Sequence, residues 1–434
     1  MLRRILIISI FTGFGQLYSI FVIKLLTNIS SGEPSVAIAQ LDSLFMFILN
    51  AIAFGLQSAA IRDLALSEDW KKQYAHIQSA RISFSLLMII AIIGLVFNQY
   101  YFIFLLAPVV ACSGEYALYA RGFPVFGSII SCLRLTIPFT CVLISAYIEP
   151  SYAGIVYVVS IFATYLLTNF LISRYLRVGY FFKPAFSSLK LYLQSFPLGM
   201  ATISLYMIGL GLVLVAPYFY QSDTVTIAFA GLKFYVLYKG VLRIIHQAFV
   251  KDMLSESVCF KVDQLSILLS LLFLSSVIFF PHAFIQLFFG AAALPHQDYF
   301  LMLGIGAVIY SFFLSMSTSA LLQKKDIPYS IVSVIAAGAM IVSAIVFSYF
   351  KTSPIPLGVA ICIGEFIWVC GLVWIATERE RVVKRILFLA ECSLFLAVPL
   401  VIRFYFEDTG TYYVLSMVLL GLILLLLHFR KFRI

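Results

Sequence analysis

Residues 329–376 read YSIVSVIAAGAMIVSAIVFSYFKTSPIPLGVAICIGEFIWVCGLVWIA, which is two long apolar runs separated by Lys351, Thr352 and Ser353. About 20 apolar residues in a row are enough for an α-helix to cross the hydrocarbon core of a bilayer. A transmembrane β-barrel would instead show short segments that alternate between apolar and polar residues. The stretch therefore predicts two membrane-spanning helices joined by a tight turn.

The same pattern repeats along the whole chain. Of its 434 residues, 63% are hydrophobic and 11% are charged, whereas soluble domains hold about 45–50% apolar and about 25% charged residues. This composition excludes a cytosolic enzyme, a disordered regulator and a secreted disulfide scaffold. Hydropathy predicts about 14 spans, at residues 5–26, 36–60, 82–98, 101–119, 128–148, 152–172, 193–217, 224–245, 264–289, 299–322, 329–350, 354–376, 387–404 and 411–429. We expect an all-α polytopic membrane protein.

The distribution of Lys and Arg predicts how the spans are oriented in the membrane. Of the 29 Lys and Arg residues, 23 fall on one side of the predicted spans, Lys71 and Arg81 among them, and three fall on the other side. Such a bias is the positive-inside signature of cytoplasmic loops. We therefore predict that both termini and the loops at 61–81, 173–192 and 377–386 are cytoplasmic.

The sequence contains no motif for a nucleotide, a metal or a catalytic nucleophile. It lacks the G-x-x-x-x-G-K-[ST], H-E-x-x-H, G-x-S-x-G and EF-hand patterns. The seven Cys form no C-x-x-C pair and are interpreted as small buried hydrophobic residues. The net charge of +10 lies in short loops, so it does not indicate a nucleic-acid partner. We expect no enzymatic activity, no metal and no cofactor.

An internal repeat predicts the arrangement of the spans. The segment Ala59-Ala60-Ile61-Arg62-Asp63-Leu64 returns 189 residues later as Ala248-Phe249-Val250-Lys251-Asp252-Met253. The halves hold six spans each, so they share one topology and are related by an axis along the membrane normal. We expect a six-helix bundle at residues 1–172, a second at 173–376, a central cavity between them, and two additional helices at 377–434.

Four short segments, in order along the chain, resemble a known transporter family. They are Gly55-Leu56-Gln57-Ser58-Ala59-Ala60-Ile61-Arg62-Asp63, Phe284-Ile285-Gln286-Leu287-Phe288-Phe289-Gly290, Leu321-Leu322-Gln323-Lys324-Lys325-Asp326, and Pro356-Leu357-Gly358-Val359-Ala360 with Glu365. This order is similar to that in the polysaccharide-unit (O-antigen, Wzx-type) flippases of the multidrug/oligosaccharidyl-lipid/polysaccharide exporter superfamily. The resemblance covers most of residues 1–376.

The resemblance implies a function, a location and partners. Such proteins move undecaprenyl-pyrophosphate-linked oligosaccharide across the bacterial inner membrane by alternating access. The implied partners are this lipid-linked oligosaccharide, membrane lipids, and the polysaccharide polymerase with its chain-length machinery. Without a nucleotide site, the energy would come from an ion gradient or from the substrate gradient.

Basic residues inside the spans are candidates for binding the substrate, because charges in a bilayer core are costly and are commonly functional. Lys233 lies about 14 Å along its helix from Thr224, near the midplane. Each candidate also has a structural interpretation, such as snorkelling to the interface for Lys239. The candidate substrate-binding residues are Lys233, Lys239, Arg134, Lys24 and Asn50.

Carboxylates inside the spans are candidates for ion coupling, because a desolvated carboxylate takes up a proton more readily than an exposed one. Glu365 is the first choice, since no basic residue lies within a helical turn of it in the sequence. Asp42 is the second, and it has an alternative as an outer-interface residue. Glu115 is the third, with the alternative of a structural pair with Arg134.

Three rival functions remain open. A lipid II flippase is the nearest, because fourteen spans resemble that branch more than the twelve often assigned to Wzx-type proteins. A multidrug antiporter of the same superfamily should have an acidic cavity, whereas the deep charges at Lys233 and Lys239 are basic. An O-antigen polymerase or ligase should carry a large periplasmic loop, but every outside loop here has about ten residues or fewer.

Overall fold

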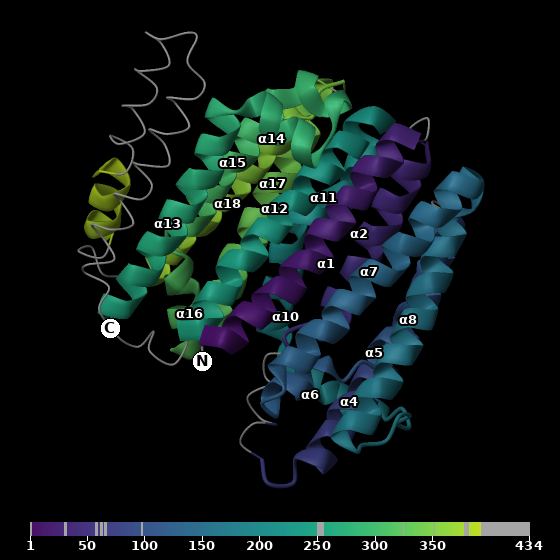
Figure 1. The fold of residues 1–434 in the computed structure, drawn as a ribbon. Coiled ribbons are helices and arrows are strands. Elements are labelled where there is room, and N and C mark those ends of the chain that lie inside the picture. The colour runs from purple at the N-terminus through teal and green to yellow at the C-terminus, as the bar shows by residue number, and fades with distance from the viewer. Residues whose placement is uncertain are drawn as a thin grey trace, which may run out of the picture.

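A computed structural model of the chain describes a helical protein (Figure 1). The described residues are 2–29, 33–56, 60, 64, 67–96, 99–249, 256–323, 325–350, 352–376 and 382–391. Within these ranges the backbone forms helices and turns and no β-strand. This confirms the all-α fold class.

The N-terminal group consists of the helices up to residue 176. They are α1 (Leu2–Ile29), α2 (Glu33–Ala53), α4 (Trp70–Met88) with its 3₁₀ continuation η1 (Ile89–Val96), η2 (Gln99–Leu106), α5 (Ala107–Ala111), α6 (Glu115–Ala120), α7 (Pro124–Ile148), η3 (Pro150–Tyr152) and α8 (Ala153–Leu176). In this group α7 packs against both α1 and α8, and α2 packs against α8.

The C-terminal group follows the segment 177–185, which lies in a loop that the sequence predicts to be cytoplasmic. Its elements are η4 (Phe186–Leu189), α9 (Lys190–Gln194), α10 (Phe196–Tyr206), η5 (Met207–Gly211), α11 (Leu212–Val215), η6 (Ala216–Tyr218), α12 (Ser222–Phe249), α13 (Glu256–Phe279), α14 (Pro281–Phe288), η8 (Ala291–His296), α15 (Gln297–Ser311), α16 (Leu314–Leu322), α17 (Asp326–Val346), η9 (Phe347–Phe350) and α18 (Ile355–Ala376). Here α17 packs on α18 and α10, and α15 packs on α18 and α13.

Ten of the described helices are long and apolar enough to cross a membrane, and the bent pair α15–α16 makes up to eleven. A shorter apolar stretch of α1, Gly13–Leu26, covers the C-terminal part of the first predicted span, 5–26. The predicted span at 411–429 lies outside the described residues, and so does all of 387–404 beyond residue 391. The count of fourteen therefore stays a prediction, as does the division at 172/173.

Three predicted span boundaries were wrong. The span placed at 82–98 begins at Trp70, because its first turns are polar yet helical. The span placed at 264–289 ends at Phe279, and α14 begins anew at Pro281, since Pro is favoured in the first turn of a helix and disfavoured inside one. The span placed at 299–322 begins at Ala291 and bends by 44°.

The two groups meet along α1 and α2. Helix α1 packs on α12 and α14, and α2 packs on α10, α11 and α12. Gly55 permits the close approach of α10: its φ is +72°, and an added Cβ would lie 2.7 Å from the backbone nitrogen of Gly199. In Figure 1, α14 lies at one end of the molecule, and α4 and α6 lie toward the other.

Candidate functional site

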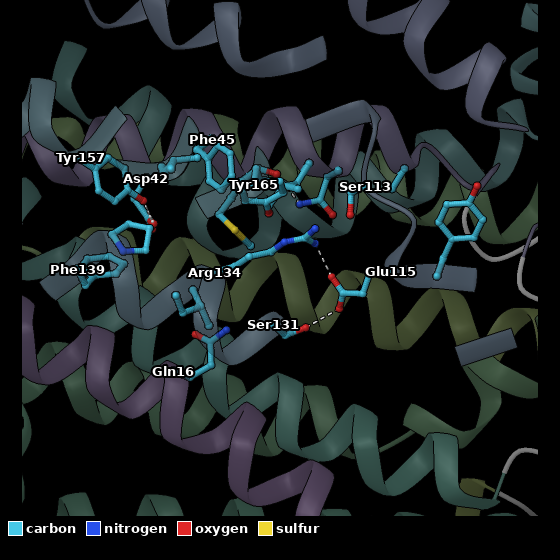
Figure 2. Close-up of a pocket in the computed structure, with 18 of the residues that line it drawn as sticks. Gln16, Asp42, Phe45, Ser113, Glu115, Ser131, Arg134, Phe139, Tyr157 and Tyr165 are labelled. Atoms are coloured by element: carbon cyan, nitrogen blue, oxygen red, sulfur yellow. Dashed lines mark hydrogen bonds and ion pairs between the residues drawn. The ribbon is translucent and has the colours of Figure 1, made fainter. Parts of the chain in front are cut away.

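A cavity of about 280 Å³ lies inside the N-terminal group (Figure 2). Its wall is built from α1, α2, α4, α6, α7 and α8 and carries four charged side chains, which are Asp42, Arg81, Glu115 and Arg134. Asn50 also lines it. The sequence predicted a cavity between the two groups; this one lies within the first group and reaches the contact between the groups at Asp42.

Arg134 is held in the cavity wall by three polar neighbours. Its guanidinium donates to Glu115 Oε2 at 2.8 Å, to Thr168 Oγ1 at 2.9 Å and to Asn169 Oδ1 at 2.7 Å. The Tyr165 ring centre lies 4.2 Å from its carbon Cζ. Figure 2 shows the ion pair between Arg134 and Glu115, which both line the cavity. The structural alternative that sequence analysis left open for these two residues, a mutual pair, is thus observed.

Lys233 joins the two helix groups through Asp42. Its Nζ lies 3.0 Å from Asp42 Oδ2, and Tyr157 donates to Asp42 Oδ1 at 2.6 Å. Lys233 is on α12, about 16 Å along the helix from Ser222. The lysine and the aspartate are each 3% exposed, and the Phe139 ring centre lies 4.1 Å from the ammonium. The charges therefore form a buried ion pair between α2 and α12.

Lys239 and Glu365 form a second buried ion pair, within the C-terminal group. Lys239 Nζ lies 2.6 Å from Glu365 Oε1, and Tyr235 donates to the same oxygen at 2.8 Å. Lys239 also donates to the carbonyl of Ile208 at 3.3 Å. Ile208 lies where the helix path from α10 to α11 is broken, with φ −75° and ψ 60°. A backbone break inside a membrane needs such a partner for its freed carbonyl.

Glu365, the first ion-coupling candidate, has a basic partner that is distant in the sequence. Sequence proximity showed no basic residue near it, but α12 brings Lys239 from 126 positions away. The cation stabilises the ionised carboxylate and opposes proton uptake. A coupling role for Glu365 stays a prediction.

The two remaining candidates lie apart from these pairs. Asn50 donates to the carbonyl of Met46 one turn earlier on α2 and faces the cavity. Lys24 lies near the end of α1 and donates to the carbonyls of Gln286 and Leu287, both at 2.8 Å, at the end of α14. Lys24 therefore connects the two groups away from the cavity.

The arrangement matches solved transporter structures. A lipid II flippase, MurJ, in an inward closed conformation aligns with a TM-score of 0.71 at 16% identity, covering 98% of this chain and 99% of MurJ. A MATE structure in complex with MaL6 aligns with a TM-score of 0.59 at 15% identity, covering 88% and 96%. The eukaryotic MATE transporter AtDTX14 aligns with a TM-score of 0.54 at 14% identity, covering 90% and 99%.

The chain has the fold of the MurJ and MATE transporters. No family model matches the sequence. No curated protein matches it either. The likeness therefore rests on the path of the chain.

Sequence analysis missed Arg81 within this MurJ-like fold, because it counted that residue among the cytoplasmic cations. Arg81 is on α4, about 16 Å along the helix from Trp70, and is 6% exposed. Its signal was present in the sequence: Tyr74, Gln78, Arg81 and Ser85 follow one another at helical spacing and are all buried.

Proposed function

We propose that the protein is a flippase that moves undecaprenyl-pyrophosphate-linked oligosaccharide, an O-antigen or similar polysaccharide repeat unit, across the bacterial inner membrane by alternating access. The observation that carries the proposal is the Lys233–Asp42 ion pair. It joins the two helix groups where both side chains are buried. This contact can have two arrangements: Lys233 is paired with Asp42, or Lys233 is paired with the substrate. A substrate that binds one arrangement more tightly shifts the equilibrium between them.

The substrate's pyrophosphate carries the charge needed to compete with Asp42 for Lys233. When the ammonium turns to the phosphate, Asp42 loses the cation that stabilises its ionised form. Tyr157 then remains as the hydrogen-bond partner of Asp42, and the buried carboxylate is less well stabilised than in the ion pair. The same exchange at Lys239 and at Arg134 would release Glu365 and Glu115. Lys24 and Asn50 complete the proposed substrate-binding set.

A lipid II flippase is the second candidate. It is favoured by the structural likeness to MurJ, which extends over nearly the whole of both chains. Its substrate would use the same basic residues, because it is also a lipid-linked sugar. The two candidates differ in the sugar that the protein must accommodate.

A multidrug antiporter is less well supported. Organic cations need carboxylates that are available to them. Here Asp42, Glu115 and Glu365 are each within 3.0 Å of a lysine or arginine nitrogen, and Asp263 lies 2.6 Å from Arg385 Nε. A cationic drug would have to displace a protein cation from each of them.

The proposal includes a location and partners. We place both termini on the cytoplasmic side, as the Lys and Arg distribution predicts. Polysaccharide polymerase and chain-length machinery would act on the flipped product. Cross-linking in cells that make the polysaccharide would test these contacts.

A reconstituted flipping assay tests the function. Proteoliposomes would contain a fluorescent undecaprenyl-pyrophosphate oligosaccharide, fluorescent lipid II or an entrapped organic cation, and flipping would be read by quenching with a membrane-impermeant reagent. We expect the oligosaccharide lipid to flip faster than in empty liposomes and in Lys233→Ala liposomes. Faster flipping of lipid II would support the second candidate. Transport of the cation, with both lipids static, would overturn the proposal.

A further inference from the structure

The buried cation Arg81 has no carboxylate partner among the residues that the structure describes. The side chain is 6% exposed, it lines the N-terminal cavity, and its Nε has no hydrogen-bond partner. The hydroxyl of Tyr116 is also buried without a partner, and the ring centre of this tyrosine lies 4.9 Å from Arg81 Cζ. Because an arginine does not lose its proton in a protein, its charge must be balanced in another way.

The acids on the cavity wall are already engaged. Figure 2 shows Glu115 accepting from Arg134 and Ser131, and Asp42 accepting from Tyr157. Asp42 also accepts from Lys233. These pairs cancel one positive charge with each negative charge. The charge of Arg81 is left over, so the wall of the cavity carries an uncompensated positive charge on a buried side chain.

The cavity also has the room and the donors that a small anion needs. Its volume of about 280 Å³ is well above the roughly 30 Å³ that one water occupies in the liquid. The side chains of Ser113, Tyr116 and Asn50 line it beside Arg81 and supply hydroxyl and amide groups. Arginine is well suited to phosphate and other oxyanions because it presents a rigid fork of N–H donors.

We propose that the cavity of the N-terminal group binds a small anion, chloride or phosphate, with Arg81 as its counter-charge. The phosphate is either free inorganic phosphate or the phosphate of a polyprenyl lipid. The anion neutralises the charge left over by the two wall pairs. The cavity shares its wall with Asp42, Asn50 and Arg134. A lipid-borne phosphate at Arg81 therefore rests on the proposed function, whereas a free chloride or phosphate does not depend on which substrate is flipped.

The test measures unfolding temperature, with the full-length protein in detergent. Chloride replaces gluconate at constant ionic strength, and inorganic phosphate or undecaprenyl pyrophosphate is added in separate chloride-free series. The variants are Arg81→Gln, Arg81→Lys and, as a matched control, Arg174→Gln at an exposed arginine of α8. We expect saturable stabilisation of the wild type and the control. We expect an apparent affinity at least about tenfold weaker in Arg81→Gln, since one charge-assisted contact is worth about 1.5–3 kcal/mol.

The outcomes separate the sources. Stabilisation by chloride or inorganic phosphate alone supports a free anion, and stabilisation only by undecaprenyl pyrophosphate supports a lipid-borne phosphate. Equal stabilisation of wild type and Arg81→Gln, or none by any of the three, overturns the site. If Arg81→Gln does not fold, crystals of the wild type grown with bromide decide. An anomalous bromide peak at Arg81 supports a free-anion site. A cavity that is empty of bromide, and also empty of phosphate in crystals grown with inorganic phosphate or undecaprenyl pyrophosphate, overturns the site.

Discussion

At the scale of single residues, Lys233 is the position where a substitution should be most informative. Removing one member of a buried ion pair leaves the other charge buried and alone, at a cost of about 3–5 kcal/mol. We expect Lys233→Ala to abolish flipping and to lower the unfolding temperature, while the protein still inserts. Lys233→Arg should keep part of the activity. Complementation of a flippase deletion, with membrane-fraction blots for insertion, measures both.

A double variant separates stability from function. Asp42→Asn with Lys233→Met removes both charges, so it should recover the stability that Lys233→Ala loses. It should remain inactive, because it has no ammonium for the pyrophosphate. Full complementation by either Lys233→Ala or the double variant would show that the pair has no role in transport.

Glu365 allows a test of ion coupling. In Glu365→Gln the amide cannot exchange a proton when Lys239 leaves it. We expect a pH gradient to accelerate flipping by wild-type protein in proteoliposomes and to have no effect on Glu365→Gln. The rate is measured for both proteins with and without the gradient. Equal rates in all four conditions would leave Glu365 as a packing residue.

The individual charges were predictable, but their partners were not. Lys233, Lys239 and Glu365 stand out because a charge in an apolar run is conspicuous. Lys239 and Glu365 are 126 positions apart in the sequence. Their contact therefore becomes visible only in the folded chain, where Lys239 on α12 reaches Glu365 on α18. Arg81 was missed for a different reason: Lys71 and Lys72 lower the hydropathy of the first turns of α4, which placed the predicted span too late in the sequence.

At the scale of elements, hydropathy located the helices better than it located their breaks. It merged α13 and α14, because Phe280 and Pro281 interrupt the helix without interrupting the apolar run. It also missed the backbone break at Ile208 within the span at Phe196–Tyr218. Both breaks are changes of backbone angle inside apolar runs, so hydropathy does not detect them.

The contact between α1 and α14 gives a prediction about an element. Lys24 binds carbonyls at the end of α14, where the last turn of a helix has no internal partners for them. A cation there is worth about 0.3–1 kcal/mol. Lys24→Met should therefore lower the ratio of molecules with α1 and α14 in contact to molecules with them apart by about two- to fivefold. Spin labels are placed at the exposed positions Phe21 on α1 and Leu287 on α14. The distribution of distances between the two labels measures the fraction of molecules with α1 and α14 in contact.

Two variants serve as controls for that measurement. Lys24→Arg keeps a cation and should leave the distribution close to that of the wild type. Lys190→Gln changes an exposed lysine on α9 and should have no effect. If Lys24→Met also leaves the distances unchanged, Lys24 does not hold α1 to α14.

At the scale of the whole molecule, the sequence predicted the all-α fold class, since the length and number of the hydrophobic runs are properties of the whole chain. The position of the cavity could not be predicted in this way. Polar side chains of α2, α4, α7 and α8 converge on it from distant parts of the sequence, and Asp42, Arg81, Glu115 and Arg134 meet only in the folded chain.

The orientation in the membrane is the last prediction. The structure places the first turns of α4 beside the segment after α8: Lys71 Nζ donates to the carbonyl of Arg177 at 3.2 Å, and Ser188 Oγ lies 3.0 Å from His76 Nδ1. The segments at 67–76 and 177–190 therefore lie at the same end of the molecule, and the bias of Lys and Arg predicts that this end is cytoplasmic.

Single cysteines on a Cys-free background test this orientation. We expect cysteines at Lys71 and Lys183 to react with a membrane-impermeant thiol reagent only after the cells are opened, because both positions are exposed and would face the cytoplasm. A cysteine at Tyr349, which is 87% exposed on η9, should react in intact cells whose outer membrane has been made permeable. The reverse labelling pattern would show that the protein has the opposite orientation in the membrane. Reaction at Lys71 without reaction at Lys183 would contradict the shared end as well as the orientation, because these two segments are joined by the contacts between α4 and η4.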